Sequence, residues 1–312
     1  MILVTGANGF VGAALCEQLH ASGASVRGAM RMVTKTSAFE TVVTANLADP
    51  INWTTALKGV TQVVHLAARV HVMKEHSTDP LAAFRCVNVV GTGELARQAA
   101  AAGVKRFVFL SSIKVHGEYS AVNTAFTASD IPTPQDPYSQ SKLEAEKELR
   151  IIGLNTGMDI VVIRAPLVYG SGVKANFSSM LRWISYGVPL PLGAIHNKRS
   201  LVSVDNLIDL IVLCLEHPSA AGETLLVADG EDISTTELLN RLGQLMGKKA
   251  NLFAVSEKWL MWAATVLGKR GVAQRLCRSL QVDIDATKRV LGWSPPLSLN
   301  QGLKKTVEGM YR

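Results

Sequence analysis

A tyrosine and a lysine four residues apart are the residues of this chain best suited to chemistry. Tyr138 and Lys142 stand in the run Tyr138-Ser139-Gln140-Ser141-Lys142, and residues four apart on a helix share one face. A nearby ammonium stabilises a phenolate, so the pair predicts a tyrosine pKa lowered from about 10 toward neutrality. Such a phenol could both donate and accept a proton. Because the same spacing occurs on many solvated helices, the pair alone leaves a surface role open.

A glycine-rich turn near the N-terminus indicates an anion site. Residues 1–5 read as a short buried strand and residues 13–19 as a helix, with Gly6, Gly9 and Gly12 between them. The first glycine permits a tight turn, the second lets backbone approach a pyrophosphate, and the third lets the helix lie close to the strand. Helix N–H groups would then face the anion. This context predicts a dinucleotide site; a turn without a ligand is the alternative.

The elements that must position these residues alternate between strand and helix. The expected strands are residues 25–30, 63–66, 107–111 and 160–163, and the expected helices are 81–102 and 138–155. Such alternation predicts a doubly wound α/β fold, a parallel sheet with helices on both faces. Ligands bind such sheets at the carboxyl ends of the strands. Ala67, Ala68, Ser111 and Ser112 follow or end strands and are therefore expected at the cleft.

Six motifs together carry a resemblance to a known family. They are Gly6-x-x-Gly9-x-x-Gly12, His65-Leu66-Ala67-Ala68, Asn88-Val89-Val90-Gly91-Thr92, Ser111-Ser112, Tyr138-x-x-x-Lys142 and Arg164-Ala165-Pro166-Leu167-Val168-Tyr169-Gly170. In their order and separation the chain resembles the extended short-chain dehydrogenase/reductases of the NAD-dependent epimerase/dehydratase family, specifically the nucleotide-sugar branch. The resemblance spans nearly the whole chain.

The C-terminal part departs from simple strand and helix alternation. Residues 170–199 are rich in glycine, proline and turn residues, whereas 203–215 predicts a helix and 223–228 a strand. The resemblance implies a Rossmann dinucleotide-binding domain and a smaller, discontinuous C-terminal lobe that binds the nucleotide sugar. The first would comprise residues 1–168 plus about 200–230, and the second 169–199 plus 231–312.

The resemblance implies roles for individual residues. Tyr138 would be the acid/base, Lys142 would hold the nicotinamide ribose and tune Tyr138, and Ser112 would hydrogen-bond the reacting oxygen. The implied cofactor contacts are Gly6, Asn8, Gly9, Phe10, Val11, Gly12, Arg31, Asn46, Leu47, Leu66, Ala67, Ala68, Tyr138, Lys142 and Pro166. The implied substrate contacts are Ser112, Lys174, Asn176 and Arg199. No metal site is expected.

Three positions qualify this assignment. Lys174 could equally be a solvated surface residue. Arg199 is the stronger diphosphate ligand, because the run 200–205 that follows it resembles the family's arrangement, and a guanidinium matches a diphosphate in geometry and charge. Leu167 stands where many epimerases and dehydratases have an asparagine that touches the substrate. His116 replaces a tyrosine common in the family, and we expect a structural role for it.

The end of the second strand bears on the choice of cofactor. Where NAD-bound epimerases have an acidic residue, this chain has Met30, followed by Arg31. A carboxylate accepts hydrogen bonds from the NAD ribose, whereas a cation pairs with the 2′-phosphate of NADP. We therefore expect NADP(H) to be preferred and NAD(H) to be possible. Alternatively, Arg31 stacks on the adenine and either cofactor binds. Asn46, where the family usually has aspartate, is expected at the adenine edge.

Reduction, C4 epimerisation and dehydration are the family's reactions. Ser112-Ile113-Lys114 replaces the acidic pair of dehydratases, so we set dehydration aside. The cofactor prediction and the run 111–118 favour a UDP-4-keto-6-deoxy-N-acetylhexosamine C4-reductase of surface-polysaccharide (O-antigen) synthesis, which makes UDP-N-acetylquinovosamine or UDP-N-acetylfucosamine. The alternatives are an NAD-dependent UDP-sugar 4-epimerase and a non-catalytic nucleotide-binding sensor.

Composition is typical of a globular protein that binds small anions. The 312 residues are 48% hydrophobic and 18% charged. The formal charge of +7 is dispersed, so anionic small ligands are expected and nucleic acid is not. Four cysteines stand far apart, which predicts buried thiols in a reducing compartment. The chain begins on its first strand, and we expect a cytoplasmic protein. The resemblance implies a homodimer through helices 81–102 and 138–155.

Two apolar runs, 207–215 and 259–267, are too short to cross a bilayer, so no transmembrane segment is expected. The second run is flanked by lysine and arginine and carries Trp259 and Trp262. An interfacial helix would fit this pattern. We expect instead that the run forms core of the smaller lobe.

Overall fold

A seven-stranded parallel sheet forms the centre of the larger part of the protein, which confirms the predicted doubly wound α/β fold. The computed structural model describes residues 1–32, 37–70, 78–121, 123–173 and 175–310. In spatial order the strands are β3 (Glu40–Val43), β2 (Val26–Met30), β1 (Ile2–Thr5), β4 (Gln62–His65), β5 (Arg106–Ser112), β6 (Asp159–Ala165) and β9 (Thr224–Leu226). The strands expected from the sequence are all present. Edge strand β3 was not expected, because none of its residues is fully buried.

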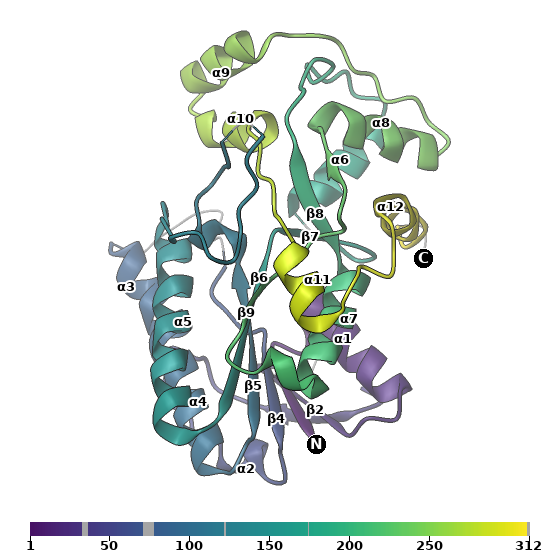
Figure 1. The fold of residues 1–312 in the computed structure, drawn as a ribbon. Coiled ribbons are helices and arrows are strands. Elements are labelled where there is room, and N and C mark those ends of the chain that lie inside the picture. The colour runs from purple at the N-terminus through teal and green to yellow at the C-terminus, as the bar shows by residue number, and fades with distance from the viewer. Residues whose placement is uncertain (33–36, 71–77, 122, 174, 311–312) are drawn as a thin grey trace.

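Helices cover both faces of this sheet (Figure 1). On one face lie α1 (Phe10–Ala21) and α7 (Val204–Glu216), and on the other α4 (Thr92–Ala101) and α5 (Pro137–Thr156). Successive strand residues point to opposite faces. Leu3 accordingly packs into the core beneath α4 and α5, whereas Val4 packs into the core beneath α1 and α7. Burial on both faces explains why the strands read as continuous apolar runs.

The helix expected at residues 81–102 is interrupted. It comprises α3 (Pro80–Arg85), a π-helical segment η1 (Cys86–Gly91) and α4. A Cβ atom on Gly91 would lie 2.4 Å from the Leu47 carbonyl oxygen, so the segment packs directly against the chain that follows β3. A π turn inserts one residue into a helix and re-aims the side chains around it. The short remaining elements are α2 (Thr54–Leu57), η2 (Ile113–Val115), η3 (Pro218–Ala220) and α11 (Asp285–Leu291).

The remaining elements form a smaller assembly above the carboxyl ends of the main strands (Figure 1). A three-stranded sheet has the order β10 (Asp232–Ile233), β8 (Arg199–Ser203), β7 (Leu167–Tyr169). Around its apolar core pack α6 (Ala175–Ser185), α8 (Thr235–Leu245) and α12 (Leu299–Glu308). Residues 170–199, which are rich in glycine, proline and turn residues, nevertheless contain a helix, because Phe177, Leu181 and Ile184 give α6 a buried face.

The apolar run 259–267 is not core. It forms α9 (Glu257–Val266), and among these residues, all of which are described, none is buried. Trp259 is 65% exposed and Trp262 is 61% exposed. The helix packs against α10 (Arg270–Cys277) and reaches the smaller core through Leu260 alone among its described side chains. Within the described chain, no helix is long and apolar enough to cross a membrane.

Candidate active site

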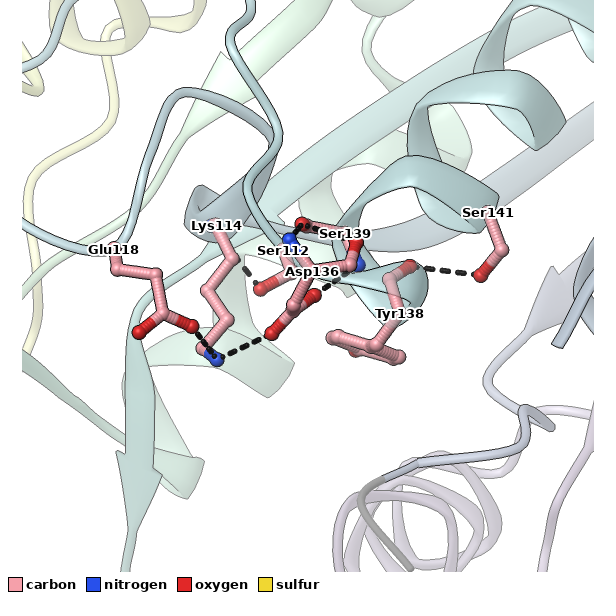
Figure 2. A network of polar contacts seen from close by, with 7 residues as sticks. All are labelled: Ser112, Lys114, Glu118, Asp136, Tyr138, Ser139 and Ser141. Carbon is pink, nitrogen blue, oxygen red and sulfur yellow. Dashed lines mark hydrogen bonds and ion pairs between the residues drawn. The ribbon is translucent and has the colours of Figure 1, made fainter. Parts of the chain in front are cut away.

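Ser112 and Tyr138 meet where β5 ends and α5 begins. Pro137 occupies the first turn of α5, and the Asp136 carboxylate caps the helix by accepting a hydrogen bond from the Ser139 amide at 2.6 Å. Ser139 returns the contact, its hydroxyl oxygen accepting from the Asp136 amide at 3.1 Å. This capping box fixes the first turn of the helix (Figure 2). The phenol of Tyr138 is thereby held within hydrogen-bonding reach of the Ser112 side chain.

Lys142 lies one turn further along α5 and is almost fully buried, with 3% of its surface exposed. Its ammonium sits 4.0 Å from the centre of the Phe109 ring on β5. Burial lowers the Lys142 pKa to about 7, although the Glu146 carboxylate one turn later acts in the opposite direction. Lys142 can therefore gain or lose its charge near neutral pH. The shared helix face predicted for Tyr138 and Lys142 is consistent with this placement.

The Tyr138 pKa differs from the sequence prediction. Burial and the nearby Asp136 carboxylate raise it to about 12, against the opposing effect of the Ser112 hydrogen bond. The predicted lowering toward neutrality is therefore wrong. The physical reason is that burial penalises the phenolate, while the same burial weakens the charge of Lys142. With this pKa, Tyr138 holds its proton near neutral pH and can donate it.

A salt-bridged lysine compensates the carboxylate beside Tyr138. Lys114 lies 2.9 Å from Asp136 and 2.8 Å from Glu118 (Figure 2). Burial alone would raise the Asp136 pKa, but the Ser139 amide and Lys114 outweigh it and lower that pKa to about 2. Lys114 thus stands where dehydratases have a carboxylate, and here it forms ion pairs with Asp136 and Glu118. Asp136 was missing from the predicted site residues. The sequence Asp136-Pro137-Tyr138-Ser139 is typical of a helix N-terminus and could have identified Asp136 as a cap.

His65, the last residue of β4, links this strand to β1 and to α4. Its Nδ1 lies 2.7 Å from the Thr5 hydroxyl and its Nε2 lies 2.9 Å from the Thr92 hydroxyl. The Thr5 oxygen also accepts the amides of Leu66 and Ala67, each at 3.2 Å. Because the Thr5 oxygen already accepts two amide hydrogens, its contact with Nδ1 uses the hydroxyl proton, and Thr5 is the donor. The proton of the His65 ring then lies on Nε2, which donates to Thr92. Complete burial and the charge of Lys142 lower the His65 pKa to about 3.

Asn88 connects α5 to the loop after β4. Its Nδ2 donates to the Ser141 hydroxyl at 2.9 Å and to the Arg69 carbonyl at 3.0 Å, and its Oδ1 accepts from the Arg69 amide at 2.8 Å. The Ser141 hydroxyl donates to the Tyr138 carbonyl at 2.7 Å. Asn88 lies within the π-helical segment, so the altered helix register aims this amide at both neighbours.

The glycine turn after β1 is tight and packs closely against α1. Gly6 adopts a left-handed conformation, φ 68°. A Cβ on Gly12 would lie only 2.1 Å from the Gly6 carbonyl oxygen, so α1 packs directly on the turn. Within the described chain, no side chain caps the N-terminus of α1 and its first turn holds no acid. Free N–H groups at a helix N-terminus favour an anion, and the pyrophosphate site expected at this turn stays a prediction.

The other predicted cofactor residues lie around the same sheet edge. Asn8, Phe10 and Val11 belong to the glycine turn and the start of α1, Leu66, Ala67 and Ala68 follow β4, Pro166 follows β6, and Arg31 directly follows β2. Asn46 follows β3, where its side chain accepts a hydrogen bond from the Ala48 amide at 3.2 Å. Leu47 lies against Gly91 of the π-helical segment. Their contacts with a cofactor stay predictions.

Of the predicted substrate residues other than Ser112, the structure describes the side chain of Arg199. Lys174 and the side chain of Asn176 lie outside the described residues. Arg199 starts β8, and its Nη1 donates to the carbonyls of Arg275 at 2.9 Å and Arg278 at 3.1 Å. Burial and the charge of Arg275 lower the Arg199 pKa. Among described residues, no hydrogen bond or ion pair joins Arg199 to Ser112, Tyr138 or Lys142.

A buried ion pair beneath α5 was not anticipated. Glu146, completely buried, accepts from Arg164 on β6 at 2.6 Å and from the Ser111 hydroxyl at 2.5 Å. Arg164 also donates to Nε2 of His116 at 2.8 Å. Burial and Arg164 lower the His116 pKa to about 4. These contacts support the structural role expected for His116. Spacing could have flagged Glu146, which shares a helix face with Lys142.

Comparisons with known proteins agree with this architecture. Residues 2–228 match the family model described as "NAD dependent epimerase/dehydratase family". A Vibrio cholerae UDP-glucose 4-epimerase is 43% identical, with 100% of this chain and 95% of the relative covered. A UDP-glucose 4-epimerase of Mycolicibacterium smegmatis is 30% identical, with 98% and 97% covered.

A solved structure shares the fold. The UDP-glucuronic acid 4-epimerase of Bacillus cereus, in complex with UDP-glucuronic acid and NAD, superposes with a TM-score of 0.80 at 23% identity, covering 99% of this chain and 98% of the other. The sequence match is far longer than half the chain, and the glycine turn and the Tyr138–Lys142 pair occupy one sheet edge. The chain therefore belongs to the NAD-dependent epimerase/dehydratase family, the extended short-chain dehydrogenase/reductases that its motifs predicted.

Proposed function

We propose that the protein is an NAD-dependent UDP-sugar 4-epimerase with Tyr138 as its acid/base. The observation that carries this proposal is the placement of Tyr138 in the capped first turn of α5, with buried Lys142 one turn away and Ser112 acting on the pKa of the phenol. Two relatives, 43% and 30% identical over nearly their whole lengths, are UDP-glucose 4-epimerases. This function was the alternative in the sequence analysis, and these relatives now favour it over the C4-reductase.

The protein's part in the mechanism is proton transfer at the C4 oxygen. Bound nicotinamide would supply a hydride acceptor that returns the hydride to either face of C4. Tyr138, in its phenolate form, takes the proton from the C4 hydroxyl, and the resulting phenol gives it back to the oxygen of the transient ketone. Ser112 orients that oxygen, and its hydrogen bond to Tyr138 favours the phenolate. Lys142, charged below about pH 7, adds a cation beside the phenol and would hold the nicotinamide ribose.

Separate observations support NAD and NADP as the cofactor. The B. cereus structure contains NAD, and an epimerase needs an oxidised cofactor that stays bound. Arg31 nevertheless follows β2 directly and is exposed. A guanidinium at this position fits a 2′-phosphate, so it favours a second candidate, the NADPH-dependent C4-reductase of polysaccharide synthesis. NAD is the cofactor we infer for the epimerase.

The substrate diphosphate would bind at the cationic end of β8. Arg199 is tied there to the backbone of Arg275 and Arg278, and the charge of Arg275 is close enough to lower the Arg199 pKa. Guanidinium groups pair well with diphosphates. Residues 169–199 and 231–312 would close over the sugar as the smaller lobe. A homodimer through α4 and α5 completes the proposal.

The decisive experiment offers the purified protein two substrate classes. In the first arm, UDP-glucose and UDP-N-acetylglucosamine are incubated with NAD, and C4 inversion is followed by proton NMR. In the second, UDP-4-keto-6-deoxy-N-acetylglucosamine is mixed with NADPH or NADH, and loss of reduced-nicotinamide absorbance is recorded. Interconversion in the first arm without net cofactor consumption is the expected result. Stoichiometric NADPH loss in the second arm alone would establish the reductase.

Variants connect the activity to the site. Tyr138→Phe removes the proton donor and should abolish turnover while cofactor binding persists. Tyr186→Phe is the matched control, because Tyr186 is 80% exposed on the surface, and it should retain full activity. An active Tyr138→Phe protein would overturn the assignment. Nucleotide binding without turnover in either arm would instead favour the sensor alternative.

A further inference from the structure

Helix α9 presents an apolar stripe to the solvent. Trp259, Trp262 and Val266 are 65%, 61% and 68% exposed, and Leu267, which follows the helix, is 70% exposed. The first three are spaced i, i+3 and i+7, so they lie on one helix face. The two indole rings touch edge to face, with centroids 5.6 Å apart. Two adjacent exposed tryptophans in one stripe are not expected of a face that meets only water.

Basic residues surround this stripe. Residues 255–278 contain five cations, Lys258, Lys269, Arg270, Arg275 and Arg278, and one carboxylate, Glu257. All five cations are exposed. Glu257 precedes Trp259 by two positions, which places it about 200° round the helix, away from the stripe. The side of α9 that carries the tryptophans is therefore apolar with a cationic border. We call Trp259, Trp262, Val266 and Leu267, with Lys258, Lys269 and Arg270, the α9 surface.

The attachment of α9 leaves this surface outward. The helix contacts α10, and Leu260 on its other side packs against the smaller core. In Figure 1, α9 stands at the outer end of the smaller assembly, remote from the main sheet. A flat surface could approach it there without displacing the body of the protein.

We propose that the α9 surface docks the protein on an anionic lipid membrane. Tryptophan favours the membrane–water interface, where its ring sits among the headgroups and its N–H remains hydrated. Lysine and arginine near the surface are attracted by anionic headgroups. An amphipathic helix with both features lies in the plane of the interface. Charge complementarity selects this partner over a second copy of the chain, because two copies would bring the same cations together.

Vesicle binding tests the proposal without any enzyme assay. The full-length protein is sedimented with sucrose-loaded vesicles of phosphatidylglycerol and phosphatidylcholine, and separately with vesicles of phosphatidylcholine alone. Preferential binding to the anionic vesicles, weakened by salt, is expected. Tryptophan emission should shift to shorter wavelength on binding. Trp53 and Trp293 are 2% and 4% exposed and should not contribute to that shift.

Two sets of variants separate the apolar and the cationic contributions. Trp259→Ser with Trp262→Ser should lower the vesicle partition coefficient at least about tenfold and remove the emission shift. Lys258→Glu with Lys269→Glu and Arg270→Glu should lower it by at least about tenfold on anionic vesicles. Because none of these side chains is buried, circular dichroism should show an unchanged fold.

Matched controls exclude a general effect of surface hydrophobicity. Ile131→Ser, in the loop before α5, and Val43→Ser on β3 remove side chains that are 84% and 61% exposed elsewhere, and they should bind vesicles as the unmodified protein does. Failure of the unmodified protein to bind anionic vesicles would overturn the proposal. Equal vesicle binding by the tryptophan variant and the unmodified protein would also overturn it. A different oligomeric state of the tryptophan variant in lipid-free buffer would overturn it too, because that result would identify the α9 surface as a self-association face. None of these outcomes bears on the C4 chemistry.

Discussion

Asp136 and Tyr138 flank Pro137 in the first turn of α5, and the Asp136 carboxylate helps to raise the pKa of the Tyr138 phenol to about 12. The same carboxylate caps the helix that carries Tyr138. One side chain therefore both orients the proton donor and holds its proton in place. This dual contact allows the electrostatic effect to be separated from the structural one, since asparagine also caps helices.

Asp136→Asn should lower the Tyr138 pKa, because the variant removes the negative charge while keeping a capping oxygen. We expect the tyrosinate absorbance titration to move to lower pH by up to about one pH unit. The limb of the kcat/KM profile that depends on the phenolate should move in the same direction. Glu118→Gln is the matched control, since it also removes a partner of Lys114 but does not act on Tyr138. An unmoved titration in Asp136→Asn would contradict this account.

Lys142→Met should abolish turnover yet stabilise the cofactor-free protein at or below neutral pH. Burial lowers the Lys142 pKa from 10.5 to about 7, so between these values the unfolded chain holds a proton that the folded protein has released. Stability of the unmodified protein therefore rises with pH across that interval, and the penalty is complete below pH 7. Melting temperatures at pH 6 and pH 10, measured by calorimetry, should differ less in the variant. Equal pH dependence in both proteins would disprove the effect.

His65→Gln should weaken the acid sensitivity of the fold. The His65 pKa is lowered from 6.5 to about 3, so the unfolded chain binds a proton as the pH falls through 6.5 and the folded protein does not. Each such group removes about 1.4 kcal/mol of stability per pH unit in that window. The buried His116, with a pKa lowered to about 4, contributes separately. Urea unfolding at several pH values below 6.5 should show a shallower slope for His65→Gln, and an identical slope would refute the assignment.

Gly12→Ala should damage both the fold and the dinucleotide site. The added methyl group would lie 2.1 Å from the Gly6 carbonyl, so α1 must move off the turn, at a cost of about 1–3 kcal/mol. Cofactor affinity, measured by calorimetric titration with NAD, should fall with it. Gly271→Ala in α10 is the control, because nothing lies within 4 Å of its added Cβ. The free energy of unfolding of Gly271→Ala should rise by up to about 1 kcal/mol. Unchanged stability and unchanged NAD affinity in Gly12→Ala would show that the close approach of α1 to the turn is not required.

Local patterns predicted the parts of the site that depend on neighbouring residues in the chain. The three glycines of the turn, the strand ends that carry Ala67 and Ser112, and the helix that carries Tyr138 and Lys142 all follow from short-range spacing. The π-helical segment at Cys86–Gly91 did not, because its hydrogen-bond register leaves no clear mark on apolar periodicity.

Properties set by distant residues escaped sequence reasoning. The Tyr138 pKa depends on burial and on Asp136 as much as on the lysine four positions away. The apolar residues of α9 have the same spacing as those of a buried helix, so their exposure could not be read from periodicity. The choice between epimerase and reductase depended on Met30, Arg31 and the run 111–118, and the relatives favour the epimerase alternative.

The hydrogen bonds that join β8 to α10 do not depend on the side chains at positions 275 and 278. Arg199 grips α10 through the main-chain oxygens of Arg275 and Arg278 rather than through their side chains. Any amino acid supplies such an oxygen, so the side chains at positions 275 and 278 can be exchanged while these hydrogen bonds persist. This segment can therefore change the charge that it carries at positions 275 and 278 and keep its place beside β8.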